Sequence, residues 1–488
     1  MTDSAARESA TAIAAGVRTG ARKAVDVVEQ NLATIAEREP EIHAFNLVMA
    51  DEARADAARI DALVAAGKDP GPLAGVTVAL KDNMCTRGIP TTCSSRILEG
   101  WRPPYDATVV RSLRDAGAVV VGKTNLDEFA MGSSTENSAF GPTRNPHDTS
   151  RVPGGSSGGS AASVAAGFAQ VSFGSDTGGS IRQPAALCGV VGVKPTYGYV
   201  SRYGLIAFSS SLDQIGPFTN SVEDAALMLD VIGGHDPLDS TSIPQAHPSL
   251  RDAIQQDVAG LRIGRITDLP EGADPDVVER VEVAFDTLRA AGAKIIDVQV
   301  PAFTFGLTAY YLIAPAEVSS NLARYDGVRY GLRVEAADTN AMYSATRAAG
   351  FGDEVKRRIM LGTYALSAGY YDAYYGKALK VRRLISDDFE RAYQHADALV
   401  LPTSASVAFK FGDKGDNPLA MYLCDTYTIP SNLSGQPGMS VPFGTGAHGL
   451  PVGVQVLAGT LQESTMFRVA AALERGLATA EAERGLAK

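Results

Sequence analysis

The 488-residue chain has 45% hydrophobic and 20% charged residues, which excludes a disordered or fibrous protein and allows a large folded core. Its net charge at pH 7 is −11, and no run of basic residues offsets it, so we expect no independent binding of nucleic acid. Because no stretch of 18 apolar residues is present and the first 20 residues contain acids, we expect neither membrane insertion nor a targeting peptide, and a cytoplasmic location.

Residues 1–70 are predicted to form a helical N-terminal segment. Apolar residues recur at helical spacing from Val25 to Ile35, and we expect Pro40 to end that helix. An alanine-rich stretch at residues 50–66 predicts another helix. The apolar stripes of these helices should pack on the remainder of the chain.

Helices and strands are predicted to alternate after this segment. A helix that closes at Gly117 precedes a strand at residues 118–121. Residues 261–300 predict a strand, a helix and a second strand, with Asp274 and Pro275 at the helix start, Gly292 at its end, and Val278, Val281, Phe285 and Leu288 on its buried face. This alternation favours an α/β fold in one large domain.

Residues 368–396 predict a long helix whose tyrosines serve packing rather than ligand binding. The four cysteines and six histidines are dispersed without closely spaced pairs of the metal-binding kind. We therefore expect free thiols and no metal site.

Two motif matches fail on their context. Residues 117–124 (GAVVVGKT) fit a phosphate-binding loop, but three consecutive valines favour a strand where that loop needs a turn. Residues 154–158 (GGSSG) fit the serine elbow of α/β-hydrolases, yet a polar, proline-bounded segment precedes them instead of a strand. Neither nucleotide binding nor the hydrolase fold is predicted.

Glycine and serine concentrate at residues 154–160 (GGSSGGS) and 174–180 (GSDTGGS). A flexible linker would also be rich in these residues, but it would lack Asp176, Arg182 and the flanking apolar segments. Small residues let backbone amides approach a reacting carbonyl, so Thr177, Gly178, Gly179 and Ser180 could form an oxyanion hole around a serine nucleophile.

Lys81 is the best candidate for the base that such a serine needs. It follows an apolar strand at residues 76–80, and burial would lower the pKa of its amine towards neutrality. From this segment alone, a lysine that merely caps an exposed strand end is an equally good interpretation.

Residues 80–82 (LKD), 154–161 (GGSSGGSA) and 176–182 (DTGGSIR) resemble the amidase signature family over essentially the whole chain. The resemblance implies a single domain over residues 1–488, with a central mixed β-sheet covered by helices on both faces. It implies that Ser180 is the nucleophile, Ser156 the bridging serine and Lys81 the terminal base, with a cis peptide bond before Ser156. All three triad positions match the family pattern.

Within this family, residues 199–217, 369–375 and 425–432 resemble the subunit that hydrolyses glutamine for tRNA-dependent amidotransferases. The resemblance implies that Arg358 binds the α-carboxylate of glutamine and Asp425 its α-ammonium, which suits the planar fork of arginine. Without it, Arg358 would be interpreted as a surface charge in the basic run at residues 356–358.

The same resemblance implies B and C partner subunits and mischarged tRNA held by a partner, as in the conversion of Glu-tRNA(Gln) to Gln-tRNA(Gln). ATP and Mg²⁺ are expected at the partner, and no cofactor in this chain. The alternatives are a stand-alone amidase for other small amides and a catalytically silent assembly subunit. The sequence leaves open whether Glu-tRNA(Gln) or Asp-tRNA(Asn) is used.

Overall fold

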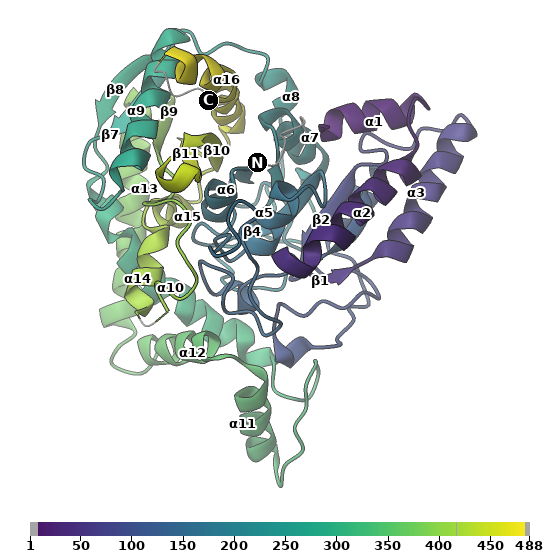
Figure 1. The fold of residues 1–488 in the computed structure, drawn as a ribbon. Helices are drawn as coiled ribbons and strands as arrows, with labels where there is room; N and C mark the ends of the chain where they lie inside the picture. The colour runs from purple at the N-terminus through teal and green to yellow at the C-terminus, as the bar shows by residue number, and fades with distance from the viewer. Residues whose placement is uncertain (1–7, 416, 484–488) are drawn as a thin grey trace.

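The computed structural model describes residues 8–415 and 417–483, which form an α/β structure around one sheet of eleven strands (Figure 1). The strand order is β1-β3-β2-β4-β6-β5-β10-β11-β9-β7-β8. The strands are β1 (Phe45–Val48), β2 (Thr77–Lys81), β3 (Val119–Thr124), β4 (Val171–Asp176), β5 (Val191–Lys194), β6 (Gln214–Thr219), β7 (Arg262–Ile266), β8 (Lys294–Val298), β9 (Ala398–Pro402), β10 (Gly438–Thr445) and β11 (Pro451–Ala458).

The sheet is mixed, and its parallel part positions the candidate site. Strand β2 lies between β3 and β4 and is parallel to both, with Leu80 opposite Lys123 on one side and Phe173 on the other. Strand β7 is parallel to β8 and β9, and the remaining neighbours are antiparallel. The carboxyl ends of β2, β3 and β4 therefore meet at one edge of the sheet.

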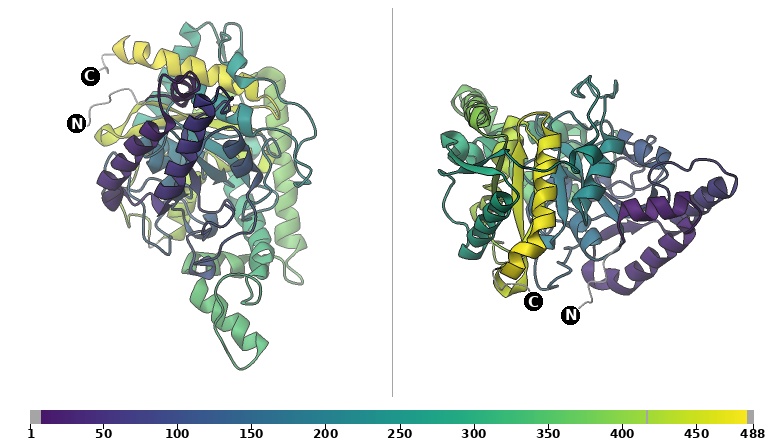
Figure 2. Two further views of the ribbon diagram at one scale, coloured as in Figure 1. Left: turned by 90° about the vertical axis from the view of Figure 1, so that its right-hand side faces the viewer. Right: turned by 90° about the horizontal axis from the view of Figure 1, so that it is seen from above.

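Helices cover both faces of the sheet, as predicted (Figure 2). Along β9, Ala398 and Val400 pack in the same core cluster as α16, whereas Leu399 and Leu401 pack with α13, because successive strand side chains point to opposite faces. The remaining described helices surround these layers. The α-helices are α1 (Ala10–Arg18), α2 (Ala24–Ile42), α3 (Ala50–Ala65), α4 (Thr108–Asp115), α5 (Gly158–Ala165), α6 (Arg182–Cys188), α7 (Val222–Ile232), α8 (Leu250–Ala253), α9 (Pro275–Ala290), α10 (Gly306–Asn321), α11 (Thr339–Gly350), α12 (Asp353–Ala365), α13 (Lys377–His395), α14 (Pro418–Tyr422), α15 (Ile429–Ser434) and α16 (Glu463–Glu483).

The N-terminal segment is helical as predicted and contains α1 to α3, of which α2 and α3 match the two helices predicted; all three lie together beside the β1 edge of the sheet (Figure 1). Two details differ from the prediction. Helix α2 continues through Pro40 to Ile42, and its end is instead marked by His43 in a left-handed conformation. The segment also contributes strand β1, which pairs antiparallel with β3. Residues 1–7 of the predicted segment lie outside the described residues.

The predicted strand-helix-strand unit is confirmed as β7, α9 and β8, but its helical face is shifted. Val278 is 46% exposed, whereas Val277 is buried. The predicted long helix begins only at Lys377, after a π-helical turn at Asp372–Gly376. Of the tyrosines in residues 368–396, Tyr375 and Tyr393 pack against the core as predicted, whereas Tyr370 and Tyr374 contact each other at the surface.

The four cysteines are free thiols and are buried. Within the described residues, no group of three metal-ligating side chains could hold a metal ion. No helix in this part of the chain combines the length and apolar character needed to cross a membrane.

Candidate active site

Lys81 ends strand β2 and is fully buried at the carboxyl edge of the parallel strands. Its Nζ lies 2.8 Å from Ser156 Oγ, 2.7 Å from Ser157 Oγ and 3.0 Å from Ser175 Oγ. Burial lowers the pKa of Lys81 from 10.5 to about 7, although neighbouring aspartates oppose this shift. A large fraction of the amine is therefore neutral near pH 7 and can accept a proton.

Ser156 lies in the loop before α5, and the peptide bond between Gly155 and Ser156 is cis, as the resemblance implies. Backbone and side chains crowd this loop. A Cβ atom on Gly155 would lie 2.5 Å from the Ser134 amide nitrogen and would also collide with Asp127, so only glycine fits. The loop follows no strand, which agrees with the rejection of the α/β-hydrolase elbow.

The discounted phosphate-loop match is also explained by the structure. Gly122 to Thr124 belong to strand β3, and Lys123 is fully buried. The Lys123 amine forms an ion pair with Asp82 at 3.2 Å and donates to the Met84 carbonyl at 2.9 Å. The N–H donors of Lys123 are thus occupied by contacts within the fold.

Ser180 lies between β4 and α6, beside the loop that carries Ser156. The Ser157 amide donates to the Ser180 carbonyl at 3.2 Å, which holds the two loops together. Ser180 is 8% exposed, whereas Ser156 and Lys81 are fully buried. Ser180 is therefore the most exposed of the three residues, and the buried Lys81 and Ser156 side chains are hydrogen-bonded to each other.

The backbone before Ser180 was expected to form the oxyanion hole. The Gly179 amide donates to Asp176 Oδ1 at 2.9 Å, so it is already engaged in this structure. Thr177 donates its hydroxyl to Asp213 at 2.6 Å, and neither its amide nor that of Gly178 is a described donor to Asp176. The amides of Thr177 and Gly178 have no acceptor among the described residues, so they are available to a substrate oxygen where that of Gly179 is not.

Asp176 and Arg182 form a closed ion pair behind this loop. Both are fully buried, with Arg182 Nη2 at 2.9 Å from Asp176 Oδ1 and Nε at 3.0 Å from Oδ2. Asn432 also donates to Asp176 at 2.7 Å. Burial raises the pKa of Asp176, but Arg182, Lys194 and Asn432 together lower it more, so the net pKa lies well below its usual value.

Arg358 projects from α12 and is only 3% exposed, unlike its neighbour Arg357, whose side chain is 44% exposed. Its Nε donates to Glu354 at 2.7 Å. The guanidinium carbon lies 5.2 Å from the ring centroid of Tyr311 and 5.3 Å from that of Tyr422. Arg358 is therefore a buried, oriented charge and not part of a solvated basic run.

Asp425 is 8% exposed and lies between α14 and α15. Its Oδ2 accepts a hydrogen bond of 2.5 Å from Ser133, whereas its buried Oδ1 has no partner among the described residues. Burial raises the pKa of Asp425 from 3.8 to about 7, although Ser133 and Arg358 lower it. Asp425 therefore offers a cation a poorly solvated carboxylate, one oxygen of which has no hydrogen-bond partner among the described residues.

Gly178 lies in the Ser180 loop and contacts the residues that neighbour Arg358 and Asp425. A Cβ atom on Gly178 would meet the ring of Tyr310 at 2.9 Å, and Tyr310 is followed by Tyr311, which contacts Arg358. The hydroxyl of Thr428, three residues after Asp425, donates to the Gly178 carbonyl at 2.6 Å. The fold therefore brings α10, α12 and the segment after α14 to the Ser180 loop.

Several residues of this site were not predicted from the sequence. Ser157 and Ser175 hold the Lys81 amine, Ser133 holds Asp425, and Glu354 holds Arg358. Ser157 and Ser175 each lie next to a residue that the motifs singled out. Glu354 stands four residues before Arg358, a spacing at which side chains meet on a helix.

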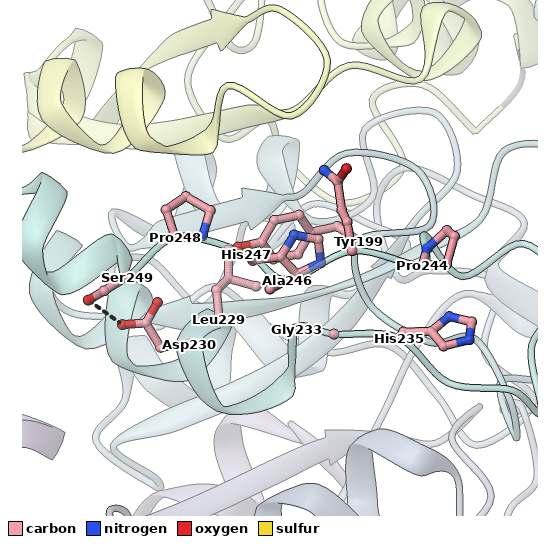
Figure 3. Close-up of a pocket in the computed structure, with 12 residues that line it drawn as sticks. Tyr199, Leu229, Asp230, Gly233, His235, Pro244, Ala246, His247, Pro248 and Ser249 are labelled. Carbon is pink, nitrogen blue, oxygen red and sulfur yellow. Dashed lines mark hydrogen bonds between the residues drawn. The ribbon is translucent and has the colours of Figure 1, made fainter.

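A cavity of about 650 Å³ lies elsewhere, between the end of α7 and residues 244–249 (Figure 3). Tyr199 and His247 stack there with their ring centroids 3.7 Å apart. No predicted site residue lines this cavity, so its size alone does not locate the chemistry.

The sequence profile of the amidase family matches residues 26–467. The chain belongs to the amidase family. It is 60% identical over 456 residues to the A subunit of glutamyl-tRNA(Gln) amidotransferase from Gloeobacter violaceus, with 93% of each chain covered. The crystal structure of the Thermotoga maritima counterpart of that relative is 46% identical and has a TM-score of 0.78, covering 93% of this chain and 91% of that chain. A peptide amidase bound to chymostatin is 33% identical, with a TM-score of 0.83 and coverage of 96% and 97%.

These family members agree with the observed architecture, which is the amidase signature fold. Membership also makes the chain an enzyme of the amidase type. The fold class predicted from the sequence is therefore confirmed.

Proposed function

We propose that this amidase-family enzyme is the glutamine-hydrolysing subunit of a tRNA-dependent amidotransferase. The observation that carries the proposal is the pair of buried charges beside the serine loop. Arg358 is an oriented cation, and Asp425 is a carboxylate with an open oxygen. Free glutamine carries a carboxylate and an ammonium group that complement these two residues.

Ser180 is the nucleophile in this proposal. Its Oγ attacks the side-chain amide carbon of glutamine, and its proton passes through the Ser156 hydroxyl to the Lys81 amine. Backbone amides at Thr177 and Gly178 stabilise the oxyanion of the tetrahedral intermediate.

Collapse of the intermediate breaks the carbon–nitrogen bond. The proton returns through Ser156 to the leaving nitrogen, so ammonia departs and an ester of Ser180 remains. Water then attacks this ester and loses a proton to the same relay. Glutamate is released, and the Ser180 hydroxyl is restored.

The ammonia is used by the B and C partner subunits, which hold the mischarged tRNA and bind ATP and Mg²⁺. They activate the glutamyl group of Glu-tRNA(Gln), which ammonia converts to Gln-tRNA(Gln). The acidic charge of this chain, −11, suits a division of labour that leaves tRNA to the partner. We place the complex in the cytoplasm.

The alternative is a stand-alone amidase for other small amides, an activity compatible with the fold. Such a substrate would lack either the α-carboxylate or the α-ammonium. It would leave Arg358 with Glu354 as its charged partner and Asp425 Oδ1 without one, so these two buried groups would be less well satisfied than they are with glutamine. Glutamine makes use of both residues.

Substitution of Ser180 by alanine in the reconstituted complex tests the proposal. Ser180→Ala should abolish glutamine-dependent formation of Gln-tRNA(Gln) but spare formation from added ammonia, because only the partner's chemistry is then needed. Both rates are measured on the same preparation with mischarged tRNA and ATP. Loss of both activities would identify Ser180 as a structural residue and contradict the proposed role.

A further inference from the structure

Glu128 is a buried carboxylate that the proposed mechanism does not use. It follows strand β3 and is 3% exposed. Its Oε1 accepts a hydrogen bond from the Ser95 hydroxyl, and its Oε2 accepts one of 2.8 Å from the Gly352 amide. Ser95 Oγ also lies 3.2 Å from the Gly350 carbonyl oxygen. Glu128 thereby binds the short joint between α11 and α12.

This joint immediately precedes the helix that carries Arg358. Gly352 is the N-cap residue of α12 and has ordinary extended dihedrals, φ −74° and ψ 172°. A Cβ atom at Gly352 would nevertheless lie 2.5 Å from Glu128 Oε2. Glycine is therefore needed at residue 352 because the Glu128 carboxylate occupies the place of a side chain, and not because the backbone conformation requires it.

The neighbouring Asp127 makes a similar connection to the other substrate charge. Its carboxylate accepts hydrogen bonds from the amides of Thr135 at 2.8 Å and Asn137 at 3.1 Å. These bonds shape the loop from which Ser133 donates to Asp425. Asp127 and Glu128, which follow β3, thus connect the sheet edge beside Lys81 to the segments that position Asp425 and Arg358.

We propose that Glu128 is a positioning residue for substrate binding, which holds the start of α12 so that Arg358 faces the substrate carboxylate. The inference rests on the proposed role of Arg358 with glutamine. Glu128 touches neither the substrate nor the serine relay in this scheme. Its loss should weaken glutamine binding without changing the reactivity of Ser180.

The test compares two measurements on the full-length chain co-purified with its partner subunits. The first is KM and kcat for glutamine hydrolysis. The second is the rate at which phenylmethylsulfonyl fluoride sulfonylates Ser180, a reaction in which an O–S bond forms and fluoride leaves. This reagent carries neither α-charge of glutamine, so its rate reports the serine relay without Arg358.

Glu128→Ala should raise KM for glutamine about 10- to 100-fold, because it leaves the Gly352 amide without its acceptor. The sulfonylation rate should stay within about twofold of the wild type. Glu128→Gln should restore KM to within about threefold, since its amide oxygen can accept from Gly352 while its NH₂ donates to Ser95. The matched control is Asp353→Ala, which removes a 98% exposed acid from the first turn of α12 and should leave KM unchanged.

Gly352→Ala gives a second, independent approach. Alone it should raise KM by displacing the Glu128 carboxylate, and in the Glu128→Ala background it should add nothing, because the collision is gone. An additive effect, an unchanged KM in Glu128→Ala, or a parallel fall in sulfonylation would overturn the inference. Arg358→Ala separates the two hypotheses: if it leaves KM unchanged, the proposed substrate contact fails, whereas a raised KM there with a normal KM in Glu128→Ala refutes only the role of Glu128.

Discussion

Two sets of buried charges lie around the Ser180 loop, and they differ in how completely they are satisfied. The Asp176–Arg182 pair is closed, because each group has several partners from α6, α15 and the sheet. The Arg358 and Asp425 pair is open. Arg358 donates from Nε to Glu354, and Asp425 Oδ1 has no described partner.

The pKa values of the two aspartates express the same difference. Burial acts to raise the pKa of Asp176, but Arg182, Lys194 and Asn432 together outweigh it, so this pKa lies well below its usual value. Burial dominates at Asp425 and raises its pKa to about 7. A buried carboxylate that the fold leaves poorly compensated is a candidate for ligand binding, whereas a fully compensated one supports the scaffold.

Lys81 resembles the closed pair in having several hydrogen-bond partners and resembles Asp425 in having a pKa shifted by burial. Its substitution should have the largest effect on the rate of glutamine hydrolysis. Its amine is surrounded by serine hydroxyls, but burial still lowers its pKa to about 7. Lys81→Ala should reduce kcat for glutamine hydrolysis by about 10²- to 10⁴-fold, because the relay loses its terminal base. Rates are compared at saturating glutamine, and near-normal turnover would remove Lys81 from the mechanism.

Breaking the closed pair should mainly affect stability. Arg182→Met leaves Asp176 as a buried charge without its cation, which should lower the free energy of unfolding by about 3–5 kcal/mol. Urea unfolding of wild type and variant measures this difference. An unchanged unfolding midpoint would show that the pair is not the structural element described here.

The motifs drew attention to the residues of the closed pair and of the candidate triad. Ser156, Asp176, Ser180 and Arg182 lie in two motifs close together in the sequence, and Lys81 ends a recognisable apolar strand. The local pattern indicated a serine nucleophile with an oxyanion hole and made Lys81 a candidate base, with a strand-capping lysine as an equal alternative. The role of Ser156 came from the resemblance, and the ion pair between Asp176 and Arg182 was not predicted. Strand β1 was missed because four residues are too few to show alternation, and it becomes a strand only by pairing with β3.

The open pair could not be predicted from local pattern. Arg358 stands in a basic run that is typical of a solvated helix, and its burial depends on Tyr311 and Tyr422, which come from two other helical segments. Asp425 meets Ser133, a residue 292 positions away. Only the resemblance to the family indicated these two residues, because their environment is created by tertiary packing.

Asp425→Asn should change binding without the loss of stability expected for Arg182→Met. Without the carboxylate, the ammonium of glutamine loses a charged partner, so KM should rise about 10- to 100-fold. Replacing a poorly compensated carboxylate with a neutral amide should leave the free energy of unfolding unchanged or raise it near pH 7. A fall in stability as large as that of Arg182→Met would remove the distinction between the two pairs.

The smallest expected effect is the dependence of kcat/KM on pH around neutrality. Lys81 must be neutral and Asp425 ionised for productive binding and attack, so each must lose a proton, and both pKa values are about 7. Activity should therefore rise with pH, and near pH 7 it should be about fourfold below its alkaline plateau.

The acid limb of this profile separates the two titrations. Well below pH 7, log(kcat/KM) for wild type should rise by about two units per pH unit, because two protons are lost. In Asp425→Asn the slope should fall to about one, since Lys81 alone still titrates. Steady-state rates between pH 5 and 9, with circular dichroism to verify folding at each pH, measure both slopes. A wild-type slope of one that Asp425→Asn does not change would mean that the open carboxylate plays no part in binding glutamine.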